Sequence, residues 1–205
     1  MVKGGKVTEA AINSAQRGAL LKVLVINAAL ALALFTAGQF ADSSALMANA
    51  LDNLSDALTY AVSYFAVTRS QRWKAGAAAI TGVMLLILAV GVLADAWRRF
   101  EVGSSPIGPT MIVMAFVAVG LNYWCIRILR SHRSDDVNLR AAWTMSLNDF
   151  ASNLGILLAG VAVAWSGSRL PDLLVAAAIA LMAAYGGVKT LKDARSAGAA
   201  ASDRT

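Results

Sequence analysis

Residues 44–62 read SALMANALDNLSDALTYAV, an apolar stretch that carries two carboxylates four residues apart, Asp52 and Asp56. Residues i and i+4 of an α-helix lie on the same face, so both side chains point in nearly the same direction. A carboxylate at the centre of a membrane-spanning helix costs about 3 kcal/mol on insertion scales, and such residues usually face the bundle interior and take part in function. The stretch therefore predicts a membrane helix with a functional acidic face.

The composition of the whole chain is typical of a membrane protein. Of its 205 residues, 58% are hydrophobic and 15% are charged, which is more apolar than a soluble core requires. A spanning helix needs about 20 apolar residues. We predict an all-α membrane protein with six transmembrane helices, at about residues 18–41, 44–68, 75–97, 108–128, 140–166 and 170–188.

Three segments are expected along the chain. Residues 1–17 form a cytoplasmic N-terminal segment, and residues 18–190 form the six-helix transmembrane domain. Residues 191–205 are a short cytoplasmic tail, rich in small and polar residues, which we interpret as a helix end followed by disorder.

The basic residues predict the orientation. All but three of the 18 fall on the side of the termini, the exceptions being Arg98, Arg99 and Arg169. Lys and Arg near helix ends are retained on the cytoplasmic side. We therefore expect a multi-pass protein of the plasma (inner) membrane with both termini in the cytoplasm. This also explains the net charge of +6 without nucleic acid as a partner.

A second polar stripe lies at residues 145–160, MSLNDFASNLGILLAG, where Asp149 interrupts an apolar run. Counted from the ends of their helices, Asp149 and the pair in residues 44–62 all lie near the midplane. Facing helices pack with their axes about 8–10 Å apart, so we expect the three carboxylates to close around one cation. Asn49 extends the first stripe, and its amide is either a further neutral ligand or a group that orients a carboxylate.

With these two segments, the chain resembles the transmembrane domain of the cation diffusion facilitator (cation efflux) family of divalent metal exporters. Residues 44–62 resemble the second helix of that family and residues 145–160 its fifth, and each of these helices supplies half of the metal site. The resemblance implies Asp52, Asp56 and Asp149 as metal ligands. It also implies a homodimer.

Met145 stands where the family places the remaining ligand, usually a histidine or an aspartate. A thioether is a weak, soft ligand, which suits cadmium better than manganese or magnesium. In the alternative interpretation Met145 only packs, and Asn49, Asn148, Ser152 or a water completes the shell. Zinc follows from the resemblance alone. Zinc or cadmium is thus favoured as the transported ion, with cobalt, nickel, iron and manganese left open, and no resident cofactor is expected.

A second departure from the family pattern concerns the C-terminal side. Most members carry a soluble metal-binding domain after the sixth helix, whereas this chain resembles a shorter branch without it. A dimer would then be held by membrane helices. His132, the single histidine, is interpreted as a solvated loop residue.

The remaining polar residues are given structural roles. Asp95 is expected to form an ion pair with Arg98 and Arg99, since it lies one turn before them. Asp172 is expected to cap a helix start after Pro171.

Three further residues are assigned to helix packing. Asn27 and Asn122 are expected to hydrogen-bond between helices, and Cys125 is interpreted as a buried small residue.

The mechanism that we expect is exchange of a divalent cation for protons by alternating access, without enzymatic chemistry. The sequence contains no GxxxxGK phosphate-binding loop, so an existing gradient would supply the energy. The alternative is a proton-coupled exporter of a small organic cation that uses the same carboxylates. Tyr60 and Tyr64 would then form an aromatic wall for the organic ion.

Overall fold

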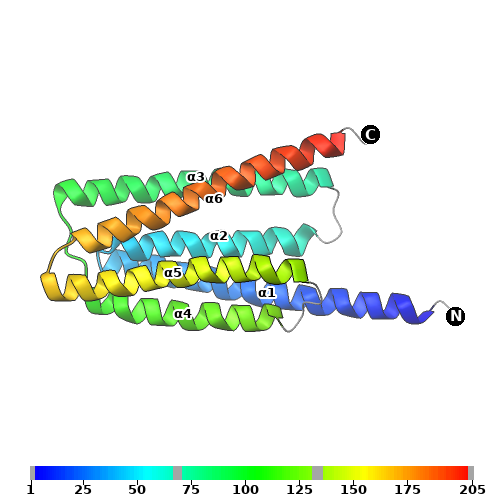
Figure 1. Cartoon of the computed structure of the whole chain (residues 1–205), viewed down its shortest axis with the longest axis horizontal. Coiled ribbons are helices and arrows are strands. Elements are labelled where there is room, and N and C mark those ends of the chain that lie inside the picture. The colour runs from blue at the N-terminus through cyan, green and yellow to red at the C-terminus, as the bar shows by residue number, and fades with distance from the viewer. Residues whose placement is uncertain (1–2, 67–70, 131–135, 203–205) are drawn as a thin grey trace.

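The computed structural model describes residues 3–66, 71–130 and 136–202, with side chains described for 17–62, 64–65, 72–129 and 149–196. The described residues form six α-helices and no strand (Figure 1). They are α1 (Lys3–Phe40), α2 (Ser44–Ala66), α3 (Gln71–Val102), α4 (Gly108–Arg130), α5 (Asp136–Ser166) and α6 (Leu170–Ser202). The predicted all-α architecture is confirmed.

The helices extend further than the apolar stretches predicted, mainly at the end that carries both termini (Figure 1). The disorder predicted within residues 191–205 is wrong for most of that segment, because α6 continues to Ser202. The segment ARSAGAAAS that ends α6 is rich in alanine, which has the highest helix propensity of all residues. The charged and small residues after residue 188 end the apolar stretch, but the helix itself continues through them.

The six helices run antiparallel to their neighbours in sequence, so both termini lie at one end of the bundle (Figure 1). We call this end the terminal end and the opposite one the loop end. Helices α3 and α6 pack closely together because Gly82 and Gly187 let their backbones meet: a Cβ placed on Gly82 would lie 3.0 Å from the carbonyl oxygen of Gly187. Helix α2 is central and contacts α1, α3, α5 and α6.

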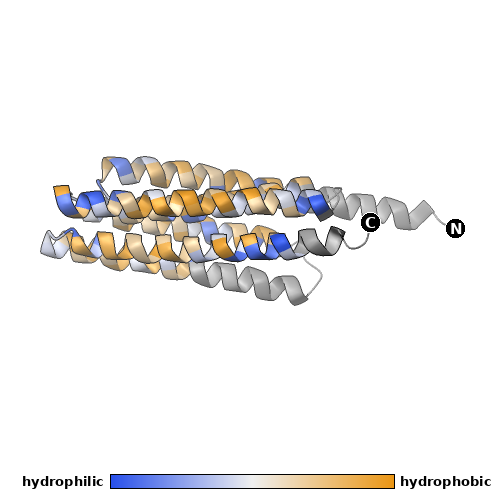
Figure 2. Ribbon diagram, turned by 90° about the horizontal axis from the view of Figure 1, so that it is seen from above, coloured by the Kyte–Doolittle hydropathy of each residue, from blue (hydrophilic) through white to orange (hydrophobic). Residues whose placement is uncertain are grey.

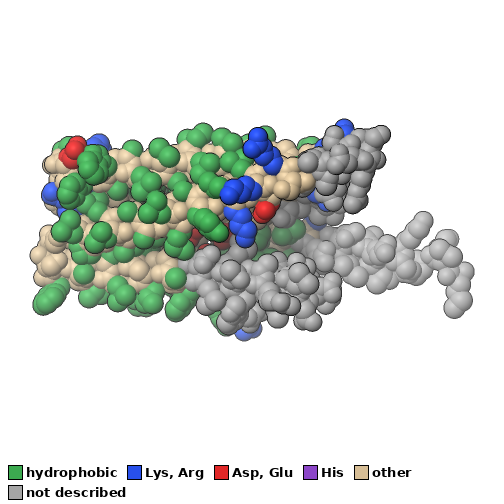
Figure 3. Space-filling view, turned by 45° about the horizontal axis from the view of Figure 1, so that its top comes forward, with side chains coloured by type: hydrophobic (Ala, Val, Ile, Leu, Met, Phe, Trp, Pro, Cys, Tyr) green, Lys and Arg blue, Asp and Glu red, His purple; other side chains and the backbone are tan. Residues whose placement is uncertain are grey.

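Five helices are long and apolar enough to cross a membrane within the described residues, and α2 is the exception. The reason is its central position, since a helix enclosed by four others needs less apolar surface than one that faces lipid. On the outside of the bundle, hydrophobic residues predominate between the polar ends (Figure 2). Lys and Arg side chains gather toward the terminal end on the face shown in Figure 3. The outer surface of the bundle is therefore typical of a multi-pass membrane protein.

An ion-pair cluster holds the loop end together. Arg99 lies between Asp95, whose Oδ2 is 2.6 Å from its Nε, and Asp42 of the α1–α2 loop. Arg98 pairs with the second oxygen of Asp95 at 2.8 Å, which confirms the predicted pairing of Asp95 with both arginines. Asp42 has a φ of +51°, a left-handed conformation that aspartate tolerates better than most residues. Its carboxylate also accepts the N–H of Ser105 at 2.7 Å, which ties the loop to the α3–α4 connection.

Asp172 caps a helix, although not the one expected. It lies in the first turn of α6, but its carboxylate accepts the N–H groups of Ser44 and Ala45 at 2.8 and 3.1 Å and the hydroxyl of Ser43 at 2.5 Å. These groups belong to the start of α2, where four N–H groups have no partner within the helix. The prediction that Asp172 caps α6 is therefore corrected: it anchors α2 to α6.

This contact predicts a loss of stability in Asp172→Ala. The substitution leaves the buried N–H groups at the start of α2 without an acceptor, and we expect the free energy of unfolding to fall by about 2 kcal/mol. Denaturant unfolding in detergent micelles measures it. Asp193→Ala, which removes an exposed carboxylate from the same helix, is the matched control and should leave stability unchanged. Equal stability of the two variants would contradict the capping role.

Candidate functional site

An amide pair fixes the register between α2 and α5. Nδ2 of Asn49 on α2 donates to Oδ1 of Asn153 on α5 at 2.9 Å, and both residues are almost fully buried, at 0% and 1% exposed. Each helix supports its own amide one turn away: Nδ2 of Asn53 donates to the carbonyl oxygen of Asn49 at 2.9 Å, and Nδ2 of Asn153 donates to that of Asp149 at 2.7 Å. Because the two helices are antiparallel, this single contact determines which residues face each other along the rest of their length.

The acidic residues follow the amide pair toward the terminal end. The hydroxyl of Ser152 lies near enough to Asp52 to donate to its carboxylate. One turn further along, Asp56 of α2 and Asp149 of α5 lie within electrostatic range of each other, and Asp52 lies within range of both. The three aspartates that the sequence singled out thus come together from two helices. All three are half-buried.

The site is closed toward the loop end. Leu46, Met111 and Ile156 are fully buried there and belong to one apolar cluster that joins α2, α4 and α5. Helices α4 and α5 meet closely at this end, because a Cβ on Gly108 would lie 2.5 Å from the carbonyl oxygen of Gly160. A tightly packed apolar plug therefore separates the acidic residues from the loop end.

No three His, Cys, Asp or Glu side chains of the described residues lie close enough together to form a complete metal shell. The three aspartates repel one another when ionised, and repulsion keeps carboxylates apart unless a cation or protons neutralise them. An ion held by all three would require the side chains to converge further.

Three other residues from the sequence analysis have side chains outside what the structure describes. The side chains of Met145 and Asn148 in α5 lie outside the described residues, and so does the whole of His132. The amide of Asn49 is engaged with Asn153 and Asn53, which favours an orienting role over a ligand role.

The sequence analysis did not connect Cys125 to the site. Asn27 on α1 donates from Nδ2 to Sγ of Cys125 on α4 at 3.5 Å, so it does hydrogen-bond between helices as expected. The thiol also lies within electrostatic range of Asp56 and Asp149. A depth count along α4 would have placed Cys125 level with these acids, but an isolated cysteine in an apolar helix gives no reason to make it.

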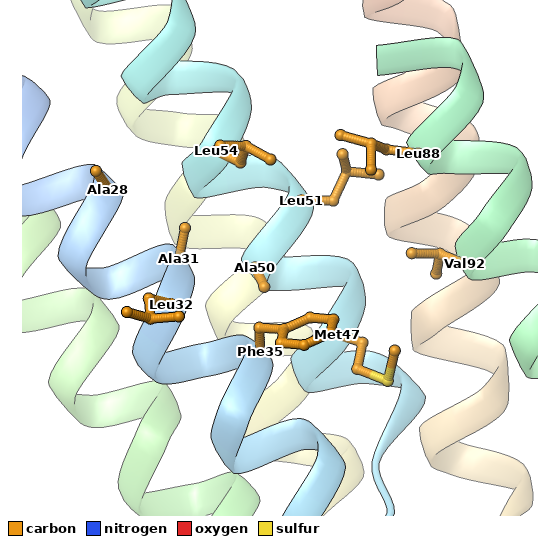
Figure 4. A pocket seen from close by; sticks show the side chains of 10 residues that line it. All are labelled: Ala28, Ala31, Leu32, Phe35, Met47, Ala50, Leu51, Leu54, Leu88 and Val92. Atoms are coloured by element: carbon orange, nitrogen blue, oxygen red, sulfur yellow. The ribbon is translucent and has the colours of Figure 1, made fainter. Parts of the chain in front are cut away.

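An apolar groove of about 360 Å³ lies elsewhere, between α1, α2 and α3. Figure 4 shows its lining, in which Phe35 and Leu32 of α1, Met47 and Leu51 of α2 and Leu88 of α3 contribute hydrocarbon and thioether groups. It has no carboxylate, and the acidic residues do not line it. The groove therefore does not provide the cation site.

The fold and the buried acids define the class of protein as a multi-pass helical membrane protein with a polar site in its core. Residues 20–197 match the family described as the cation efflux transmembrane domain. The chain belongs to this family, and the resemblance found in the sequence is confirmed.

Three curated relatives illustrate the relationship. The chain is 23% identical over 170 residues to the cadmium, cobalt and zinc/H(+)-K(+) antiporter of Bacillus subtilis (strain 168), covering 76% of this chain and 55% of that protein. It is 23% identical over 169 residues to zinc transporter ZitB of Yersinia pestis, with 76% and 54% covered. It is 22% identical over 156 residues to metal cation efflux system protein CzcD of Cupriavidus metallidurans (strain ATCC 43123 / DSM 2839 / NBRC 102507 / CH34), with 70% and 49% covered. The chain spans about half the length of these relatives.

The amide pair predicts energetic coupling between α2 and α5. In a double-mutant cycle of Asn49→Ala and Asn153→Ala, we expect a coupling energy of about 1 kcal/mol, the usual size for a hydrogen bond between membrane helices. Unfolding in mixed micelles measures each variant. Ser166→Ala, on an exposed residue at the end of α5, provides the control cycle with Asn49→Ala and should show no coupling. Additive effects of the two asparagine substitutions would argue against the register described above.

Proposed function

We propose that the protein exports a divalent transition-metal cation through a site formed by Asp52, Asp56 and Asp149. The observation that carries this proposal is that three carboxylates from two antiparallel helices lie within electrostatic range of one another inside a membrane bundle. Carboxylates are costly in a bilayer and are retained where they bind an ion or carry protons. Membership of the cation efflux family supports the same function.

Zinc or cadmium is the favoured cargo. The curated relatives are named for transport of zinc, cadmium and cobalt, and a site of carboxylates can bind each of these ions as well as nickel, iron or manganese. Met145 remains the proposed weak ligand on α5. Asn49 orients the helix that carries Asp52 and Asp56, through its hydrogen bond to Asn153.

Transport is proposed to occur by alternating access with protons as counter-ions. In the conformation described, the apolar cluster around Ile156 closes the acids from the loop end, and the proposed route of the cation is from the terminal end. The cation enters as the carboxylates lose protons, and protons displace it when the site faces the other side.

Export of a small organic cation is less well supported. That function requires open aromatic faces near the acids. The guanidinium of Arg17 already lies over the ring of Tyr64, 5.9 Å from its centroid, and Tyr60 packs against the apolar cluster around Cys125. The geometry favours a small, bare ion.

The transporter is proposed to lie in the plasma (inner) membrane with both termini in the cytoplasm. The terminal end lies in the cytoplasm at the plasma (inner) membrane, because Arg72, Lys74, Lys189, Lys192 and Arg195 are at that end. Residues 18–190 are proposed as the transport domain, with residues 1–17 and 191–205 on its cytoplasmic side. The protein works as a homodimer and transports its cargo without changing it chemically.

Loss of a carboxylate should strongly weaken cation binding. Removal of groups that only support a metal ligand already weakens affinity about 10–100-fold. We therefore expect at least about 100-fold weaker binding of Cd²⁺ and Zn²⁺ by Asp56→Asn or Asp149→Asn. Isothermal titration calorimetry on purified protein measures this. Asp193→Asn keeps the same change in charge at an exposed position and should bind like the wild type, whereas unaltered binding by either site variant would exclude the proposed ligands.

Proton coupling should appear as pH dependence of both binding and transport. Carboxylate ligands must be deprotonated to hold a metal, so the affinity for Cd²⁺ should fall as pH falls. In proteoliposomes, a pH gradient with the more acidic solution on the side that receives the metal should accelerate transport. Transport that proceeds equally with and without the gradient would rule out antiport.

A further inference from the structure

Cys125 is the only cysteine of the chain, and it lies within electrostatic range of two of the acidic residues. Its side chain is buried, at 5% exposed, and its Sγ is 3.5 Å from Nδ2 of Asn27 on α1. The thiol also lies within electrostatic range of Asp56 on α2 and Asp149 on α5. Four helices therefore contribute polar groups to one region of the bundle interior.

The amide of Asn27 has an oxygen that is not used. Its Nδ2 donates to the carbonyl oxygen of Val23 at 2.9 Å as well as to the thiol. Its Oδ1 is buried, and no hydrogen-bond donor reaches it among the described residues. Oδ1 belongs to the same amide group as the nitrogen that contacts Cys125, so it is one bonded carbon away from that nitrogen. A buried acceptor without a partner is costly and calls for an explanation such as a bound ion.

The surroundings of the thiol are otherwise apolar. Cys125 belongs to a small cluster with Val23 and Leu129, against which Ile26 and Ile128 pack. An apolar shell strengthens the attraction between a cation and the few polar groups inside it. A structural role for Cys125 needs none of these features, since a small apolar residue would fill the same space.

We propose that Sγ of Cys125 and Oδ1 of Asn27 form a second, softer station for the cation in the bundle interior. This inference rests on the proposed function and adds a thiophilic preference to it. When the cation arrives, the S–H bond breaks, its proton leaves to water at the terminal end, and a sulfur–metal bond forms. Thiolate sulfur favours soft ions such as Cd²⁺, and hard ions such as Mn²⁺ gain little from it.

Titration of the purified protein with Cd²⁺ and with Mn²⁺ tests the proposal. Wild-type protein with Cd²⁺ should show an ultraviolet thiolate-to-cadmium charge-transfer band, and Cys125→Ser should lack it. The same variant should bind Cd²⁺ about 10-fold more weakly and leave Mn²⁺ binding unchanged. Asn27→Leu, which removes the amide oxygen and keeps the side-chain volume, should weaken Cd²⁺ binding while the band remains.

The control moves the thiol along the helix. Ala118 is buried on α4 two turns away from Cys125, and the double variant Cys125→Ser with Ala118→Cys keeps one buried thiol at a distance from the acids. It should behave like Cys125→Ser. If wild-type protein binds Cd²⁺ through the aspartates without a charge-transfer band, or if the relocated thiol restores the band, the second station is excluded while the proposed function stands. If wild-type protein binds no divalent cation, the proposed function fails as well.

Discussion

The hydrogen bond between Asn49 and Asn153 is the contact on which the interior of the bundle depends. Two buried amides in an apolar environment pair with each other because neither has water as an alternative. Once they pair, the antiparallel geometry places Ser152 near Asp52 and Asp149 near Asp56. A displacement of one residue between α2 and α5 would turn these side chains away from each other. The acidic residues can therefore act together only while this register holds.

The two ends of the bundle are held in different ways. At the loop end, Asp172 anchors the start of α2 to α6, and Arg99 joins α3 to the α1–α2 loop through Asp42. Together with the apolar plug around Ile156, these contacts make the loop end the tightly closed one. Toward the terminal end, long helices such as α1 and α6 extend past the acidic residues. Opening of the loop end would require the polar contacts there to break, which makes them part of the energetic cost of changing access.

Much of the fold could be predicted from the sequence, because the physics of a bilayer leaves few choices. Long apolar stretches must be helices, and a spacing of four residues placed Asp52 and Asp56 on one face. The depth of Asp149 followed from counting residues. Contacts that depend on pairing between distant segments could not be predicted in this way. Nothing in the local sequence shows that Asp172 accepts hydrogen bonds from α2 rather than from its own helix, or that Cys125 lies within electrostatic range of the acids, since both facts come from the packing of six helices.

The position of a bound divalent cation is the most direct test of the proposed site. Anomalous X-ray diffraction from crystals of the protein grown with Cd²⁺ locates the ion without reference to any variant. We predict one dominant peak between α2 and α5, in contact with Asp56 and Asp149 and within reach of Asp52. A dominant peak at the loop end beside Asp42 and Asp95, with none between α2 and α5, would contradict the account.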